Sequence, residues 1–338
     1  MENSEINDLI NNLDEDMVQF KQIICENNIN TKIKQDIANE IQIEESNNNE
    51  EQQYLNLIKD ILVNGIDKRD RTGIGTRSIF GAKLVFDLSK SFPLFTTKKM
   101  WLKGVFYELK WILSGSTDTK DLQKNKVKIW NGNSSREFLD SRNLHHYEEG
   151  DIGPTYGFAL RSFGTQYKGC SENYLGLGFD QLEYVINLIK NDPSNRRILV
   201  NLWDHTVIDE VALTPCLMTY NFYVDTENKK LNLQGYIRSS DTILGLPWNI
   251  SYLALLVNLI CNLEDIHLTP GLLNIVTCDQ HIYNNHIEQA SEICKRNPFP
   301  FPTLTINKKY KDIQEFEWED IQLSSYEFHE SIPAPMAV

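Results

Sequence analysis

The sequence predicts an α+β fold in which helices cover a mixed, largely antiparallel β-sheet. Expected strands and helices alternate irregularly, and consecutive strands are joined by short turns such as residues 225–229. No repeat of about 20 to 50 residues is present, which argues against a solenoid or a propeller. With 338 residues, of which 41% are hydrophobic, the chain can close a substantial interior.

Residues 1–53 form a separate, acidic segment. Thirteen acidic residues stand against three lysines before residue 53, so this part carries a net charge of −10 out of −14. Apolar residues between Ile6 and Ile24 recur at steps of three and four and predict an amphipathic helix, and a weaker stripe runs from Ile33 to Ile41. The polar run from Glu44 to Gln53 is typical of a linker. A partly disordered tail is the alternative. We expect an N-terminal extension followed by one main domain, residues 54–338.

Side-chain patterns place the regular elements of the main domain. Apolar residues at helical spacing predict helices at residues 54–62, 101–114, 179–190, 250–263 and 281–295. Runs of β-branched and aromatic residues between turns predict strands at residues 78–88, 197–203, 217–224 and 230–237. A loop rich in glycine and arginine, residues 65–75, separates the first helix from the first strand.

Charge and composition exclude several classes of protein. A net acidic surface repels phosphate polyanions, so neither a nucleic acid nor a membrane surface is an expected partner. The longest apolar runs, such as Tyr252 to Ile260, are shorter than the ~20 residues that span a bilayer, and no signal peptide is recognisable. Six cysteines show neither a CxxC pair nor zinc-ligand spacing with histidine. We expect a soluble, intracellular, cytoplasmic protein without a metal site.

Cys216 is the cysteine best placed for chemistry. It follows a proline at the start of an expected strand, so the thiol would be presented where a loop becomes a strand. A buried structural role is the ordinary interpretation of a lone cysteine. The neighbouring sequence favours a reactive thiol instead, because Arg196 and Arg197 open the preceding strand and Arg238 closes the following one. Arginines close to a thiol lower its pKa.

Four arginines at loops and strand ends, Arg71, Arg196, Arg197 and Arg238, suit a phosphate group. The planar guanidinium forms forked hydrogen bonds to a phosphate dianion. Viewed alone, two adjacent arginines on a strand would face opposite ways, one exposed and one paired. Together the four predict a local anion site. Glu108, among apolar residues of an expected helix, is either a catalytic carboxylate or a buried, paired one.

A dozen short segments resemble, in order and spacing, the folate-dependent thymidylate synthase family. The matching segments are Asp70-Arg71-Thr72-Gly73, Phe92-Pro93-Leu94, Thr96-Thr97-Lys98, Glu108-Leu109 with Trp111, Arg136-Glu137-Phe138-Leu139-Asp140, Gly153-Pro154 with Tyr156-Gly157, Asn191-Asp192-Pro193, Arg196-Arg197-Ile198, Pro215-Cys216, Arg238-Ser239 with Asp241, Leu244-Gly245-Leu246-Pro247 with Asn249, His281-Ile282-Tyr283 with Asn285-His286, and Met336-Ala337-Val338. The resemblance covers essentially all of residues 54–338. It implies the thymidylate synthase fold, a homodimer packed through the sheets, and a catalytic domain that converts dUMP to dTMP.

The resemblance also implies catalytic roles. Cys216 would add to C6 of the pyrimidine, so that C5 becomes the nucleophile that attacks the one-carbon unit of 5,10-methylenetetrahydrofolate. Glu108 would be the acid/base centre, with Tyr156 relaying the C5 proton. Asn249 would read uracil, because an amide both donates to O4 and accepts from N3–H. The folate would be carbon donor and reductant, so no metal is required.

Nucleotide binding is implied for a further group of residues. The residues that would hold the 5'-phosphate are Arg71, Arg196, Arg197, Arg238 and Ser239. Arg196 and Arg197 would come from the other subunit of the homodimer, which would make the dimer obligatory for activity. His281 and Tyr283 would bind the sugar hydroxyl; surface positions at the start of a helix are their alternative.

Folate binding is implied for Trp130, Asn133, Asp241 and Gly245, with Asp241 as the carboxylate that binds the pterin. Val338 would close over the bound substrates and exclude water, a role for which an ordinary tail is the alternative. The first 53 residues are too few for the dihydrofolate reductase domain that some relatives carry, so a separate reductase is expected to recycle the folate.

Several positions depart from the family pattern. Leu217 and Ile237 stand where the family usually has His and Gln, and residues 159–161 read Ala-Leu-Arg instead of Gln-Trp-Arg. Trp248 replaces a usual Phe, and Cys278 a usual Gly. Each lost hydrogen bond would weaken nucleotide ordering by ~1 kcal/mol, so we expect slower or weaker catalysis.

Two alternatives stay open at this point. A pyrimidine hydroxymethylase on the same fold would add water where thymidylate synthase adds hydride, and the mass of the product distinguishes them. A catalytically weak nucleotide- or RNA-binding protein would use the acidic segment to dock a partner. Full biological function of a Cys216→Ala protein would favour that second alternative.

Overall fold

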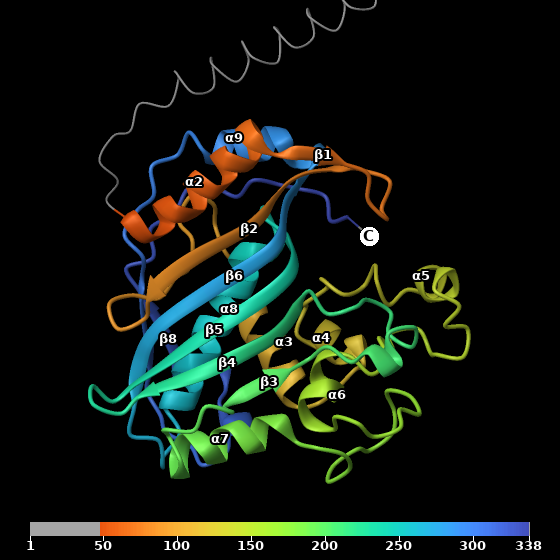
Figure 1. Ribbon diagram of the computed structural model, residues 1–338, viewed down its shortest axis with the longest axis vertical. Coiled ribbons are helices and arrows are strands. Elements are labelled where there is room, and N and C mark those ends of the chain that lie inside the picture. The colour runs from red at the N-terminus through yellow and green to blue at the C-terminus, as the bar shows by residue number, and fades with distance from the viewer. Residues whose placement is uncertain (1–47, 338) are drawn as a thin grey trace, which may run out of the picture. The chain divides into compact units, whose positions relative to one another are not determined.

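The computed structural model describes residues 48–337, and its centre is a six-stranded sheet (Figure 1). The strands lie in the order β1-β2-β6-β5-β4-β3, and all neighbouring pairs are antiparallel except the parallel pair β5–β6. The strands are β1 (Ile66–Lys68), β2 (Thr76–Asp87), β3 (Leu199–Asn201), β4 (Leu217–Asp225), β5 (Lys230–Asp241) and β6 (Thr269–Tyr283), with β7 (Thr303–Ile306) and β8 (Ile321–Ser324) forming a separate pair. The predicted α+β class is confirmed.

Helices cover one face of the sheet. The helices are α2 (Asn49–Asn64), α3 (Leu102–Leu113), α4 (Thr119–Lys124), α5 (Arg136–Ser141), α6 (Tyr156–Arg161), α7 (Gln181–Asn191), α8 (Gly245–Cys261) and α9 (Ile287–Ile293). Helix α8 packs against β5, β6 and α3 and is buried around most of its circumference, as expected for a helix that lies between a sheet and another helix (Figure 1). None of the helices in residues 48–337 combines the length and apolarity needed to cross a bilayer.

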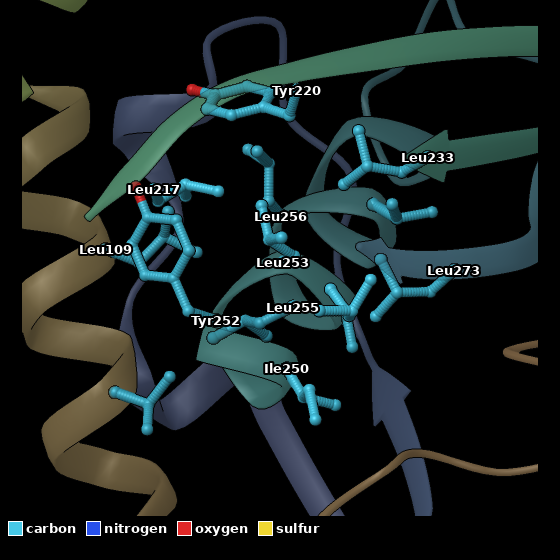
Figure 2. Packing of buried hydrophobic residues seen from close by; sticks show 14 of the residues in the cluster. Leu109, Leu217, Tyr220, Leu233, Ile250, Tyr252, Leu253, Leu255, Leu256 and Leu273 are labelled. Carbon is cyan, nitrogen blue, oxygen red and sulfur yellow. The ribbon is translucent and has the colours of Figure 1, made fainter. Parts of the chain in front are cut away.

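The main core forms between the helix-covered face of the sheet and α8. Side chains of β4 alternate, so that Tyr220 and Phe222 are buried while Tyr223 is 69% exposed on the opposite face. Figure 2 shows Tyr220 and Leu217 of β4 directed toward side chains of α8, including Leu253. On the opposite face of the sheet, apolar side chains such as that of Tyr223 are exposed to solvent.

The parallel pair β5–β6 brings two segments of the predicted site together. Strand β5 leads through α8 into β6, and parallel strands end at the same edge of a sheet. In the ladder Asp241 lies opposite His281, and Ser239 lies opposite Asp279. Residues about forty positions apart in the sequence therefore meet at one edge.

Two sequence predictions are wrong, one about residues 281–295 and one about the start of α2. Residues 281–295 are not one helix: β6 runs to Tyr283, and α9 begins only at Ile287. Strand β6 is absent from the predicted strands, although Leu273, Ile275 and Thr277 alternate as buried residues in it. The linker expected up to Gln53 is also wrong in its last residues, since α2 begins at Asn49. The proposed helices before residue 47 lie outside the described residues, and the division at residue 53 stays a prediction.

Glu51 explains why α2 begins ahead of the expected boundary. Its side chain is fully buried and accepts hydrogen bonds from the backbone N–H and the hydroxyl of both Thr96 and Thr97, at 2.7–3.0 Å. Burial raises the pKa of Glu51, and the hydrogen bonds oppose that rise. The carboxylate thus fastens the first turn of α2 to the loop that leads toward α3.

Glu51→Ala is expected to lower the free energy of unfolding by about 3 kcal/mol or more, because it leaves several buried donors without an acceptor. Urea unfolding followed by circular dichroism measures this change. Asp60→Ala, on an exposed position of the same helix, is the matched control and should change stability by less than ~0.5 kcal/mol. Equal stability losses in the two variants would contradict the anchoring role.

Candidate active site

Cys216 lies immediately before β4, and neighbouring elements hold its backbone on both sides. Its N–H donates to the hydroxyl of Tyr156 on α6 at 3.0 Å, and its carbonyl accepts from the N–H of Arg238 on β5 at 2.9 Å. The predicted position, where a loop becomes a strand, is the observed one. Helix α6 and strand β5 therefore fix where the thiol is presented.

Arg238 also holds the loop that precedes Cys216. Its guanidinium donates to the carbonyl of Pro215 at 2.8 Å, to the carbonyl of Thr214 at 3.1 Å and to the hydroxyl of Thr214 at 2.7 Å. The same group lies 5.2 Å from the ring centre of Trp203. With several of its donors engaged, Arg238 shapes the loop as well as supplying positive charge beside the thiol.

Burial raises the pKa of the Cys216 thiol above its usual value. The charges of Arg238 and Arg71 act in the opposite direction, while Asp241 adds to the rise. The lowered pKa expected from the flanking arginines is therefore not found, because burial outweighs them. Of the four arginines in the predicted group, Arg238 and Arg71 are the two whose charges act on the thiol.

Arg71 and the pair Arg196–Arg197 occupy different parts of the molecule. Arg71 is exposed in the loop before β2, lies 5.6 Å from the ring centre of Phe138 and contributes charge at Cys216. Arg196 and Arg197 are exposed in the loop that precedes β3. A single chain thus gathers Arg71 and Arg238 beside the thiol.

The register of the sheet separates Arg196 and Arg197 from Cys216. In the antiparallel pair β3–β4, Leu199 lies opposite Asn221, so the start of β3 lies toward the far end of β4. At ~3.3 Å per strand residue, Ile198, whose carbonyl accepts from the N–H of Phe222, lies roughly 20 Å from Cys216 along β4, and the two arginines precede Ile198 in the chain. Within one chain they do not join the cluster around the thiol.

Glu108 is a buried carboxylate held by two indoles. Its Oε1 accepts from Nε1–H of Trp130 at 2.8 Å, and its Oε2 accepts from Nε1–H of Trp248. The side chain is only 7% exposed. Burial raises the pKa of Glu108, and the hydrogen bonds from Trp248 and Trp130 partly offset this. The alternative of a carboxylate paired with a basic residue is thus not what the structure shows.

Tyr156 connects Cys216 with this carboxylate. Its hydroxyl accepts from the N–H of Cys216, and its ring meets that of Trp130 edge-on, with centres 5.6 Å apart. Burial, together with the charges of Cys216 and Glu108, raises the pKa of Tyr156, so the phenol stays protonated. Tyr156 also has a φ of 27°, which an aromatic residue rarely adopts. Such strain is concentrated at functional sites.

The ends of β5 and β6 supply the next group of predicted residues. Asp241 uses Oδ1 to accept from the backbone N–H of Ile243 and Leu244, which shapes the turn into α8. His281 is 7% exposed, and its Nδ1 lies 3.1 Å from a carboxylate oxygen of Asp279. Both predicted sugar-binding residues are therefore on a strand and not at the start of a helix.

Tyr283 completes this edge. Its ring meets that of His281 edge-on at 5.1 Å between centres, and burial raises its pKa to about 12, with Asp241, Asp70 and Cys216 adding to the rise. Ser239 is half-buried on β5. Because Cys216 contributes to the pKa of Tyr283, the end of β6 lies close to the Cys216 cluster.

The other predicted positions have looser connections to the cluster. Asn249 is half-buried on the first turns of α8, and its amide makes no hydrogen bond to other residues in the described part of the chain. Gly245 is the first residue of α8, beside Asp241. Asn133 is buried in the loop before α5. Val338 lies outside the described residues, so the predicted closing role is not addressed.

Comparison with known proteins identifies the family. The sequence profile described as thymidylate synthase matches residues 52–338. The chain belongs to the thymidylate synthase family. It is 44% identical over 288 residues to a thymidylate synthase of Herpesvirus ateles, a match that spans 85% of this chain and 98% of that protein.

Plant and ciliate members of the thymidylate synthase family match equally well. The bifunctional dihydrofolate reductase-thymidylate synthase of Zea mays is 47% identical over 289 residues, 86% of this chain and 55% of that protein. The corresponding protein of Paramecium tetraurelia is 43% identical over 289 residues, 86% of this chain and 62% of that protein. The chain thus spans about half the length of the bifunctional relatives that it matches.

The two apolar departures from the family pattern form a single structural unit. Leu217 lies directly opposite Ile237 in the β4–β5 ladder, next to the irregular register between Leu217 and Thr219. Both side chains are buried, at 3% and 0% exposure, and Figure 2 shows Leu217 among core residues such as Leu109 of α3. The exchange of two polar residues for two apolar ones is therefore matched across the strands and adds to the core.

Sequence reasoning missed residues that act through tertiary contacts. Trp248 was noted only as a departure, yet it is the second donor to Glu108. Thr214 carries no signal in the sequence, yet its carbonyl and hydroxyl oxygens accept hydrogen bonds from the guanidinium of Arg238. Lys98 is buried, donates to the carbonyl of Ile243, and has a pKa lowered by burial to about 8. The signals available were an extra tryptophan beside Asn249 and a lysine in a matching segment.

Proposed function

We propose that the chain is a thymidylate synthase, which converts dUMP to dTMP with 5,10-methylenetetrahydrofolate. The observation that carries the proposal is the connected cluster of Cys216, Tyr156, Trp130 and Glu108, which joins a thiol beside arginines to a buried carboxylate. A thiol and an acid/base group on one wall of a site suit covalent catalysis. Its relatives' names support the same activity.

Cys216 acts as the nucleophile in this proposal. Its sulfur bonds to C6 of the uracil ring, and the electrons of the C5=C6 bond move toward C5 and O4, so that C5 can attack an electrophilic carbon. The S–C6 bond breaks when the product forms, which returns the thiol. Arg238 and Arg71 stabilise the thiolate and, with Ser239, bind the 5'-phosphate. A bound phosphate would in turn need positive charge beyond these two arginines.

Glu108 and Tyr156 transfer the protons of the reaction. A carboxyl whose pKa is raised by burial holds its proton to a higher pH than a free carboxyl and can release it to the reacting molecule. Tyr156 relays the proton of C5: its hydroxyl oxygen accepts that proton while its own hydroxyl proton passes on to Glu108, which has by then released its proton, so the phenol is protonated before and after the step. The open amide of Asn249 reads O4 and N3–H of uracil, and His281 and Tyr283 bind the sugar hydroxyl.

The residues at the start of α8 fit a reduced folate. Oδ2 of Asp241 makes no hydrogen bond within residues 48–337, since the backbone N–H groups bind Oδ1, and a carboxylate oxygen there matches the N–H donors of a pterin. Trp130, Asn133 and Gly245 line the proposed folate site, and Val338 closes it. When bound, methylenetetrahydrofolate supplies the one-carbon unit and the hydride.

A homodimer packed through the sheets is part of this proposal. Leu199 and Tyr223 are 43% and 69% exposed on the face of the sheet that no helix of residues 48–337 covers, and an open apolar sheet face is suited to pairing with a second copy. Arg196 and Arg197 lie at the start of β3 beside this face. The proposal makes them ligands of the phosphate bound in the partner's site. A cytoplasmic location stays a prediction.

The experiment is turnover of dUMP with methylenetetrahydrofolate by the purified full chain. Absorbance follows dihydrofolate, and mass spectrometry identifies the nucleotide. Equal amounts of dTMP and dihydrofolate are expected, at a rate that Leu217 and Ile237 reduce. Hydroxymethyl-dUMP with tetrahydrofolate would replace the proposal by the hydroxymethylase alternative, and absence of any product would favour a binding protein.

A further inference from the structure

We propose that Trp248 is a positioning residue for Glu108: its indole N–H binds Oε2 while Trp130 binds Oε1, so that the carboxylate is fixed in orientation and favoured in its ionised form. The catalytic consequence rests on the proposed function, whereas the hydrogen bond and its effect on titration do not. The resemblance described above gives Phe at this position, and Phe has no donor, so the second hydrogen bond to Glu108 comes from a departure from the family pattern.

The geometry supports a role specific to Trp248. Helices α3 and α8 pack against one another, and Trp248 extends from the first turns of α8 to Glu108 on α3. Because each carboxylate oxygen accepts a hydrogen bond from a different indole N–H, rotation of the carboxylate group is restricted. Hydrogen bonds to an ionised carboxylate favour that form, and of the two indoles Trp248 has the larger effect on the pKa of Glu108.

Trp248 also connects the proton-transfer group with the base reader. Asn249 is the next residue on α8, so the same helical turn that directs an indole at Glu108 directs an amide at the proposed uracil site. Any shift of the start of α8 would move both groups together. Trp248 and Asn249 therefore have the start of α8 as their common support.

Burial and the two indole donors together determine the titration of Glu108. The titratable groups of the packed elements that respond to its charge are Tyr156 on α6 and Tyr252 on α8. Burial raises the pKa of both phenols, so both stay neutral while Glu108 titrates. Removing one indole donor changes the balance between burial, which raises the pKa of Glu108, and hydrogen bonding, which lowers it.

The test is Trp248→Phe, which restores the usual ring and removes the N–H. The protein is labelled with ¹³C at the side-chain carboxyls of glutamate, and the Glu108 signal is assigned by its loss in Glu108→Gln. The titration midpoint of Glu108 is expected to move to higher pH by about one unit in Trp248→Phe, because one charge-assisted hydrogen bond is lost. Trp101→Phe, at a side chain 45% exposed, is the control and should leave the midpoint in place.

Turnover separates the two levels of the proposal. The limb of the kcat profile that reports Glu108 should move in Trp248→Phe with the midpoint found by NMR, while the KM for dUMP stays within about twofold, since Asn249 is untouched. An unchanged midpoint overturns the positioning role. A wild-type protein that titrates as expected but makes no product refutes the proposed function and leaves the role of Trp248 standing.

A measurement on the wild type covers the case in which Trp248→Phe does not fold. With ¹⁵N-labelled tryptophan, the indole N–H signal of Trp248 should shift over the same pH range as the Glu108 carboxyl, together with that of Trp130. The signal of Trp101 serves as the internal reference. An indole signal of Trp248 that does not respond while Glu108 titrates overturns the proposal.

Discussion

Cys216→Ala is expected to abolish formation of dTMP, with turnover reduced by about 10⁵-fold or more, because the covalent bond to C6 then has no nucleophile. The fold should be unaffected, since the backbone contacts of Cys216 to Tyr156 and Arg238 do not involve the sulfur. Coupled absorbance and mass measurements determine the rate, and calorimetry determines the affinity for dUMP, which should be retained within about tenfold.

Cys170→Ala is the matched control for this experiment. Cys170 is also partly exposed, and burial raises its pKa to about 12, which disfavours a reactive thiolate. Its substitution should leave turnover unchanged. If Cys216→Ala still makes dTMP at a substantial rate, covalent catalysis through this thiol is refuted, and a binding protein that retained the fold becomes the better interpretation.

Replacing Arg196 and Arg197 together by Ala is expected to reduce kcat/KM for dUMP by about 10³-fold, because each lost hydrogen bond to a charged phosphate costs about 1.5–3 kcal/mol. The decisive measurement mixes this variant with Cys216→Ala under conditions that exchange subunits. At a dUMP concentration well below KM, each variant alone should have at most about a thousandth of the wild-type activity. A heterodimer built across a two-fold axis should contain one site with an intact thiol and both intact arginines.

In a random mixture half of the dimers are heterodimers with one intact site each, so about a quarter of the wild-type activity should return. Mixing Cys216→Ala with Glu108→Gln is the control. Both changes lie in the cluster of one chain, but on different chains each of the two sites has one defect, and no activity should return. Failure of the arginine mixture to regain activity, with exchange verified by mass, would place Arg196 and Arg197 outside the partner's site.

The strands that could be predicted are those whose pattern is carried by local residues. In β4, buried Tyr220 and Phe222 bracket outward-facing positions, and a turn leads into β5, so both were found. The long central strand β6 was assigned partly to a helix, because its last residues, including His281 and Tyr283, continue into the apolar spacing of α9. The polar start of α2 has the composition of a linker. It is helical because Glu51 accepts hydrogen bonds from donors in a distant loop, which the local sequence does not reveal.

The residues of the site could be predicted from the sequence, but the pKa of the thiol and the contacts made through tertiary packing could not. Cys216, Glu108 and Arg238 follow from motifs, and the cluster that contains them was foreseen. The pKa of Cys216 was not, because it depends on how much protein surrounds the thiol, and neither was the contact of Trp248 with Glu108, which joins residues 140 positions apart. The motifs assign Arg196 and Arg197 to the site, but the register of β3 and β4 places them far from Cys216 within one chain.

The pairing of β2 with β6 also constrains how the chain reaches this structure. Thr76 of β2 lies opposite Tyr283 of β6. These two paired strands are therefore separated in the sequence by most of the described chain. Contacts of such large sequence separation are costly to close and slow folding. During synthesis, α2 and β2 emerge long before their partner strand, and their apolar faces stay uncovered until β6 is made. The early segment is then the one most exposed to misassembly and to capture by chaperones.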